Sequence, residues 1–253
     1  MRTLRVLTLL ALVALLPVAA GPDTLLTSKS HTDAFSILGQ AQPAEDRTIQ
    51  TWIAKDRLAR LGDKTDLILR LDQDKMYIVD HNDDTFSVID LPVDMKKIFP
   101  PEMAQAMEQM AGMMKMDAKV TPTDERQKIG QWNAKKYLIQ VTAMGMNIDI
   151  ESWHSTEVDV DYAALRNLAS NRAALQPQGG DWIRKLAEIE GYPVRETVTM
   201  KLMGTPMRST QELSSVEDKA APAGTYEVPK GYAEKAFNPM EQGQRRRPRQ
   251  RPR

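Results

Sequence analysis

The sequence predicts an α+β fold, in which a single, strongly curved antiparallel β-sheet of about ten strands forms a half-barrel with helices packed on its concave side. Two observations predict this class. Short segments of alternating or β-branched residues follow one another with turn-like loops between them, which is typical of hairpins. Helix-like segments are inserted in the middle of the chain and do not alternate with the strands, which argues against a parallel sheet.

The predicted strands lie on both sides of the first helix-like segment. Leu67, Leu69 and Leu71 fall on one face of a strand, because side chains alternate between the two faces. The polar residues 81–84 favour a hairpin loop between two further strands. The segments with strand character are 31–38, 48–54, 67–71, 76–79, 85–89, 120–129, 136–143, 146–153, 194–203 and 207–216.

Two helices are expected on the concave side of this sheet. Pro100 and Pro101 introduce the first, over residues 101–116, since proline suits the first turn of a helix. The second helix is expected over residues 161–175 and ends at the glycine-containing segment 176–180.

The first twenty residues have the features of a secretory signal peptide. Arg2 and Arg5 precede an apolar run over residues 6–16, and small residues follow up to Ala20. The apolar run is too short to span about 30 Å of hydrocarbon as a helix. We therefore expect a periplasmic protein, or one released from the cell, with residues 21–30 as a flexible lead-in and residues 31–240 as the folded body.

The formal net charge of zero hides an uneven distribution. The leader holds two of the 34 basic groups and the last nine residues hold six, which leaves 26 basic against 34 acidic groups between them. Residues 241–253 are expected to be disordered, because Arg, Pro and Gln cannot form a core. This tail is interpreted either as a solubilising end or as a segment that binds anionic membrane surfaces, through Arg245, Arg246, Arg247, Arg249, Arg251 and Arg253. A nucleic-acid partner is not expected for an exported, acidic body.

Seven of the 15 methionines lie between Met95 and Met116. Three interpretations are open: flexible side chains that fill an irregular core, an adaptable lid over a lipid-like ligand, and coordination of Cu(I) by thioethers. The lid would use one face of the predicted helix, made by Met103, Met107, Met110 and Met114.

Motifs for catalysis or metal binding are missing from the sequence. Cysteine is absent, and no Gly-x-Ser-x-Gly element is present. His31, His81 and His154 lack the spacing of a local metal site. The run 80–84 resembles the opening of a calcium loop, but Thr85 stands where that loop requires glycine. We expect neither a cofactor nor an enzyme.

Several short motifs resemble those of a known family. They are residues 130–137 (GQWNAKKY), 151–153 (ESW), 191–194 (GYPV) and 228–232 (VPKGY). In this order they resemble an uncharacterised family of exported bacterial proteins that is similar to the LolA/LolB lipoprotein carriers, over about residues 31–235. The resemblance implies a half-open barrel with a cavity for a hydrophobic ligand.

These features lead us to expect a non-catalytic binding protein that holds a hydrophobic or amphiphilic, lipid-like ligand. One alternative is a structural or interaction protein of the cell envelope whose hollow is filled by its own side chains. The other is a methionine-rich Cu(I)-binding protein.

Overall fold

Most of the described chain is β-structure. The computed structural model describes residues 23–37, 40–94, 117–143, 146–160, 165, 185–186, 189–202 and 205–237. These residues form fourteen strands and one short 3-10 turn, η1 (Leu71–Gln73). The strands are β1 (Asp23–Thr32), β2 (Phe35–Ile37), β3 (Gln40–Gln42), β4 (Glu45–Ile53), β5 (Arg57–Leu61), β6 (Thr65–Arg70), β7 (Lys75–Asp80), β8 (Thr85–Asp90), β9 (Asp117–Ile129), β10 (Trp132–Ala143), β11 (Met146–Ser155), β12 (Tyr192–Leu202), β13 (Thr205–Lys219) and β14 (Ala233–Glu234).

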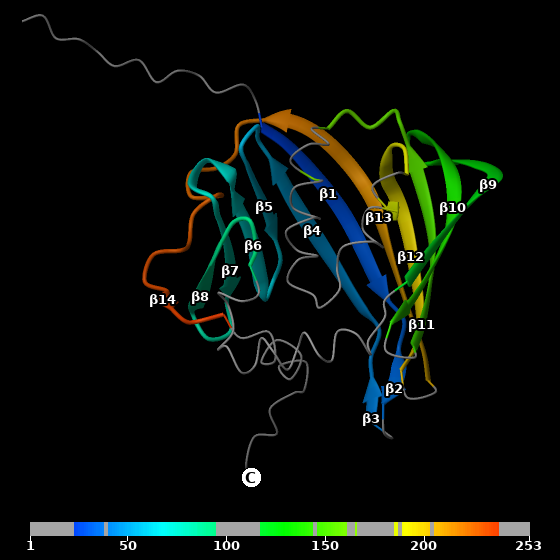
Figure 1. Ribbon diagram of the computed structural model, residues 1–253, viewed down its shortest axis with the longest axis horizontal. Helices are drawn as coiled ribbons and strands as arrows, with labels where there is room; N and C mark the ends of the chain where they lie inside the picture. Colours follow the sequence, from blue (N-terminus) through cyan, green and yellow to red (C-terminus); the bar gives the residue numbers. More distant parts are fainter. Residues whose placement is uncertain are drawn as a thin grey trace, which may run out of the picture.

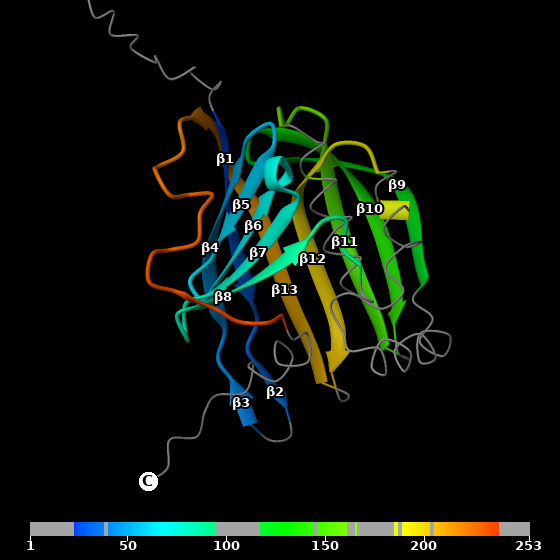
Figure 2. The same cartoon turned by 60° about the vertical axis from the view of Figure 1, so that its left-hand side comes forward.

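Twelve of these strands join in one open sheet, in the order β14-β8-β7-β6-β5-β4-β1-β13-β12-β11-β10-β9. Neighbours are antiparallel except β14, which pairs parallel with β8. Figure 1 shows the sheet bent, so that β5–β8 stand on one side and β9–β12 on the other, with β1, β4 and β13 between them. The view in Figure 2 shows the same two groups of strands. β2 and β3 form a separate ribbon.

The α+β class is wrong, because the elements formed by the described residues are strands and a single 3-10 turn. The helices predicted at residues 101–116 and 161–175 lie outside the described residues, apart from Leu165. The antiparallel hairpins are confirmed: β6 pairs with β7, β10 with β11, and β12 with β13. No helix in the described ranges is long and apolar enough to cross a membrane.

The expected flexible lead-in at residues 21–30 is also wrong from Asp23 onward. These residues belong to β1, which lies in the middle of the sheet and pairs with β4 and β13. Leu25 and Leu26 are buried on opposite faces of this strand. The two neighbouring strands satisfy the backbone groups of β1 on both sides, so a largely polar sequence is held as a central strand.

One face of β1 and β4–β8 carries an apolar cluster. It includes Leu26, Ile53, Leu58, Leu69 and Met76, each at most 2% exposed. We call this face of the sheet the inner face. Fully burying an aliphatic side chain of this kind contributes roughly 1.5–3 kcal/mol, so this cluster is a main source of stability for this half of the sheet.

The opposite, outer face of β4–β8 is covered by the segment after β13. Tyr226 of this segment packs with Trp52, Ile68 and Val79 in a second cluster. Figure 1 shows the segment between β13 and β14 on the side of β5–β8 that faces away from β9–β12. The inner face is therefore the concave one.

Candidate functional site

A row of polar side chains crosses the inner face. Ser30 of β1 is opposite Gln211 of β13, Gln211 is opposite Glu196 of β12, and Glu196 is opposite Ser152 of β11. Directly opposite residues of antiparallel strands point to the same face, and Ser30 shares its face of β1 with Leu26. We define the inner-face polar row as Arg60, Gln211, Glu196, Ser152 and His154.

Arg60 reaches this row from β5, which lies on the other side of the bend in the sheet. Its guanidinium Nη2 donates to Gln211 Oε1 over 3.2 Å, although β4 and β1 lie between β5 and β13. Strands are about 4.8 Å apart, so three spacings correspond to about 14 Å in a flat sheet. The bond therefore runs over the inner face of β4 and β1 and depends on the curvature of the sheet.

Ser152 is the centre of the other half of the row. Its hydroxyl oxygen lies 2.8 Å from His154 Nε2 and 3.1 Å from Glu196 Oε1. His154 Nδ1 donates to the carbonyl oxygen of Gly191 over 3.2 Å. The ring of Tyr137 meets the His154 imidazole edge to face, with 5.4 Å between the ring centroids. Each polar group of this half thus has a partner.

Burial shifts two groups of the row towards their uncharged forms. It raises the pKa of the Glu196 carboxyl, against the hydrogen bond from Ser152 and the charge of Arg60, which lower it. It lowers the pKa of the His154 imidazole, against the contact with Gly191. A charge is costly to remove from water, so the neutral form of each group is favoured.

The hydrogen bonds of Ser152 couple the protonation of His154 to that of Glu196. His154 carries a proton on Nδ1, because the Gly191 carbonyl can only accept. In a neutral imidazole Nε2 is then the acceptor, and it takes the single proton of the Ser152 hydroxyl. In a doubly protonated imidazole Nε2 donates to Ser152, and the hydroxyl of Ser152 then donates to Glu196 Oε1 over 3.1 Å.

This arrangement does not resemble a catalytic triad. Ser152 is fully buried, so a substrate cannot approach its hydroxyl. The acid contacts the serine, whereas a triad requires it on the far nitrogen of the imidazole. The row can hold protons and present polar groups, but it offers no accessible nucleophile.

Apolar side chains flank the row on the same face of the sheet. On β10 and β11 the neighbours are Ile139 and Ile150, which pair across the strands and pack with Leu186 and Ile189. On the other side Leu58 precedes Arg60 by two residues and belongs to the inner-face cluster. The polar row is therefore a narrow strip between two apolar areas.

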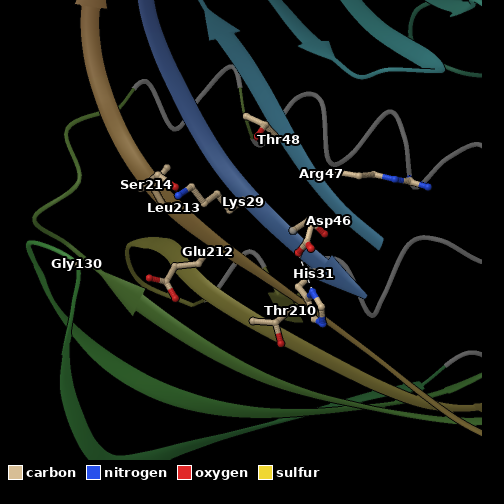
Figure 3. Close-up of a pocket in the computed structure, with 11 residues that line it drawn as sticks. Lys29, His31, Asp46, Arg47, Thr48, Gly130, Thr210, Glu212, Leu213 and Ser214 are labelled. Atoms are coloured by element: carbon tan, nitrogen blue, oxygen red, sulfur yellow. Dashed lines mark hydrogen bonds and ion pairs between the residues drawn. The ribbon is translucent and has the colours of Figure 1, made fainter. Parts of the chain in front are cut away.

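A pocket of about 720 Å³ lies where one end of β1 and one end of β4 meet the middle of β13. Figure 3 shows Lys29 and His31 of β1 beside Glu212 and Thr210 of β13, with Asp46 of β4 joined to His31. His31 Nδ1 lies 2.7 Å from Asp46 Oδ1, a hydrogen bond that raises the pKa of this imidazole. The lining mixes both signs of charge, which differs from the mostly apolar lining of lipid and small-molecule sites.

The residues proposed from the sequence fall mostly outside the described structure. This applies to Met103, Met107, Met110 and Met114, and to Arg245, Arg246, Arg247, Arg249, Arg251 and Arg253. The three histidines lie in separate places, and no group of three or more metal-binding side chains occurs among the described residues. His81 joins Asp66 to Tyr232 of the C-terminal segment.

The hairpin loop predicted at residues 81–84 is confirmed. The run 80–84 is a hairpin turn in which Asp80 Oδ1 accepts hydrogen bonds from the backbone and side-chain nitrogens of Asn82. Trp132 begins β10 directly after the turn at Gly130 and is 4% exposed.

The sequence did not predict the site residues Arg60, Ser152, Glu196 and Gln211. They lie on four different strands, and nothing in their local sequence marks them. Only the register of the sheet brings them together.

Comparison with known proteins gives the family. The chain belongs to the family described as a domain of unknown function (DUF4412), whose profile matches residues 55–232. One similar solved structure is described as "Structure of PNGF-II in C2 space group", with 12% identity and a TM-score of 0.39, covering 87% of this chain. This chain spans only 32% of that protein. No curated protein matches the chain.

Proposed function

We propose that the protein is a periplasmic binding module that holds an amphiphilic ligand against the inner face of its curved sheet. One observation carries the proposal: the described sheet is open and bent around a hollow, and its concave face is largely apolar. A ligand with an acyl chain and a polar head group matches this pattern. A few placed polar groups within an apolar surface are typical of sites that orient such ligands.

The sequence supports the other parts of the proposal. The leader-like first twenty residues support export. The order of the four motifs supports a relation to the LolA/LolB carriers, and with it a role in carrying a hydrophobic ligand without catalysis.

Native mass spectrometry tests the binding function. Protein purified without detergent from its own host should carry a bound lipid-like molecule, and the delipidated protein should bind a fluorescent acyl probe. Glu196→Leu places an apolar group in the row and should change the set of co-purified ligands. Protein that carries nothing and binds no acyl probe would contradict the proposal.

A structural or interaction protein of the cell envelope is the second candidate. The hydrogen bonds among Ser152, Glu196 and His154 favour this candidate. Polar groups that already bond one another need no ligand to satisfy them. The polar lining of the pocket at β1, β4 and β13 favours it too. Co-purification of a stoichiometric protein partner, with no bound lipid, would support this candidate over the first.

We also propose that the arginine tail brings the protein to anionic membrane surfaces. Each basic residue near such a surface contributes about 1 kcal/mol at moderate salt, and salt screens this attraction. Deleting residues 245–253 should leave the thermal midpoint unchanged and abolish binding to phosphatidylglycerol-containing vesicles at low salt. Sedimentation with vesicles measures this, with neutral vesicles as the control. If the full-length protein does not sediment with anionic vesicles at low salt, the tail does not bind membranes and serves as a solubilising end.

A further inference from the structure

The pocket at β1, β4 and β13 is built mainly from the outer face of the sheet. Six of its lining residues stand opposite one another across the three strands: Lys29 with Thr48 and Glu212, and His31 with Asp46 and Thr210. Directly opposite residues of antiparallel strands point to the same face. Because Lys29 alternates with Ser30 of the inner face, this set lies on the outer face. Figure 3 shows these residues around the pocket.

Most charged groups of the pocket already have a partner of opposite charge. The pairs are His31 with Asp46 at 2.7 Å, Arg195 with Glu212 at 2.7 Å, and Arg47 with Glu45. A carboxylate that is already bound to a cation has little left to offer a cationic ligand. The pocket therefore does not favour a ligand with a positive charge.

Lys29 is the exception among the charged lining residues. It is exposed, and its ammonium group forms no hydrogen bond or ion pair with any residue that the structure describes, although Glu212 stands opposite it. The hydroxyl groups of Thr48 and Ser214 also line the pocket and have no hydrogen-bond partner in the described ranges. The pocket thus offers three N–H donors on one cation and two hydroxyl groups that can donate or accept.

The lining restricts the class of ligand further. Leu213 is the one large apolar side chain among the described lining residues, so an acyl chain would find little to contact. An ammonium group binds carboxylate and phosphate oxygens as a compact point charge. Free hydroxyl groups beside it suit a ligand that carries hydroxyl groups of its own. The volume of about 720 Å³ is within the range of small-molecule sites.

We propose that this pocket binds an anionic sugar, whose carboxylate or phosphate pairs with Lys29 while its hydroxyl groups form hydrogen bonds with Thr48 and Ser214. Lys29 stands directly opposite Thr48, so one small ligand can contact both side chains. The site lies on the outer face and is separate from the inner face, so it does not depend on amphiphile binding there.

The test compares sugars of similar size that differ in one substituent. Glucose, glucosamine, glucuronate and glucose monophosphate are titrated into the full-length protein by calorimetry. We expect one or both anionic sugars to bind at least about tenfold more tightly than glucose and glucosamine, as for hydrogen bonds to a charged group. Glucuronate and glucose monophosphate distinguish the two kinds of anion. Acetate and inorganic phosphate test the charge without the sugar hydroxyl groups.

Lys29→Gln should lower the affinity for the anionic sugars about tenfold or more and leave that for glucose unchanged. Lys29→Arg keeps the charge and should retain most of the preference. Thr48→Val removes a hydroxyl group and should weaken the binding of the anionic sugars but not that of inorganic phosphate. Lys201→Gln is the matched control, because it removes an exposed charge of β12 that does not line the pocket. Thermal midpoints check that each variant is folded.

Each contrary result removes a defined part of the inference. Equal affinities for the four sugars, or binding of the anionic sugars that survives in Lys29→Gln, would overturn the role of Lys29. Inorganic phosphate that binds as tightly as glucose monophosphate would overturn the sugar class. Protein that binds none of these compounds would overturn the site and leave the proposed amphiphile binding untouched.

Discussion

Replacing Gly191 with alanine should destabilise the protein by roughly 3 kcal/mol or more. Gly191 has a φ of 85°, a conformation that side chains with a Cβ rarely adopt. A Cβ here would lie 2.5 Å from the carbonyl oxygen of Ser155 and 2.9 Å from the backbone nitrogen of Thr156. Both neighbours are backbone atoms, so neither can rotate away. Urea unfolding followed by circular dichroism measures the loss.

Gly224→Ala is the matched control for this prediction. Gly224 has a similar φ of 87°, but a Cβ there meets nothing within 4 Å. Its cost therefore reports the backbone strain alone, and the difference between the two variants reports the collision with Ser155 and Thr156. Equal losses in the two variants would mean that the chain near Ser155 moves aside without cost.

Gly191→Ala should also affect the polar row, because Gly191 contacts His154 of that row. The carbonyl group of Gly191 accepts the hydrogen bond from His154 Nδ1. A displaced Gly191 leaves this imidazole without its acceptor and disturbs the contact between His154 and Ser152. We therefore expect changed NMR signals of His154 in any Gly191→Ala protein that still folds.

The hairpins could be predicted from the sequence because their paired strands and the turn between them are adjacent along the chain. Leu67 and Leu69 lie two residues apart on one face of β6, and the polar turn at residues 81–84 leads directly to the next strand. The same approach failed for β1. Its sequence, DTLLTSKSHT, has two apolar residues, and its place in the sheet comes from pairing with β13, nearly two hundred positions away. Distant pairing of this kind leaves no periodic signal.

The polar row could not be predicted from the sequence either, because its residues also lie far apart along the chain. Arg60 and Gln211 are 151 positions apart, and Ser152 and Glu196 are 44 apart. Arginine, glutamine, serine and glutamate are all common on exposed strands, so none of these residues stands out in the sequence. They form a row only because the curved sheet brings them together. The methionine segment gave the stronger pattern in the sequence, but it lies outside the described residues, so its role stays a prediction.

Glu196→Gln should make the protein more stable than the wild type as the pH rises. Burial raises the pKa of the Glu196 carboxyl above its ordinary value of 4.5, so the folded state holds this proton more tightly than the unfolded state. Below the ordinary pKa both states are protonated and there is no penalty. Above it the unfolded chain loses the proton first, and the free energy of unfolding falls by up to about 1.4 kcal/mol per pH unit until the folded state ionises as well. Glutamine cannot ionise, so the variant avoids this loss.

Urea unfolding from about pH 4 to about pH 8 measures the difference. The two curves should lie close together at the acidic end and separate as the pH rises, with the variant above the wild type. His154 is present in both proteins, so its own titration largely cancels in the comparison. Glu227→Gln, which removes a carboxyl group from an exposed position, should show no such separation.

Curves for Glu196→Gln and wild type that stay parallel would mean that Glu196 ionises in the folded protein as readily as in the unfolded chain. The carboxylate would then be able to balance Arg60 across Gln211, and the polar row would carry no excess positive charge. Divergence of the curves supports a Glu196 that stays uncharged in the folded protein. The stability of one variant thus tests the charge state of the polar row without any ligand being present.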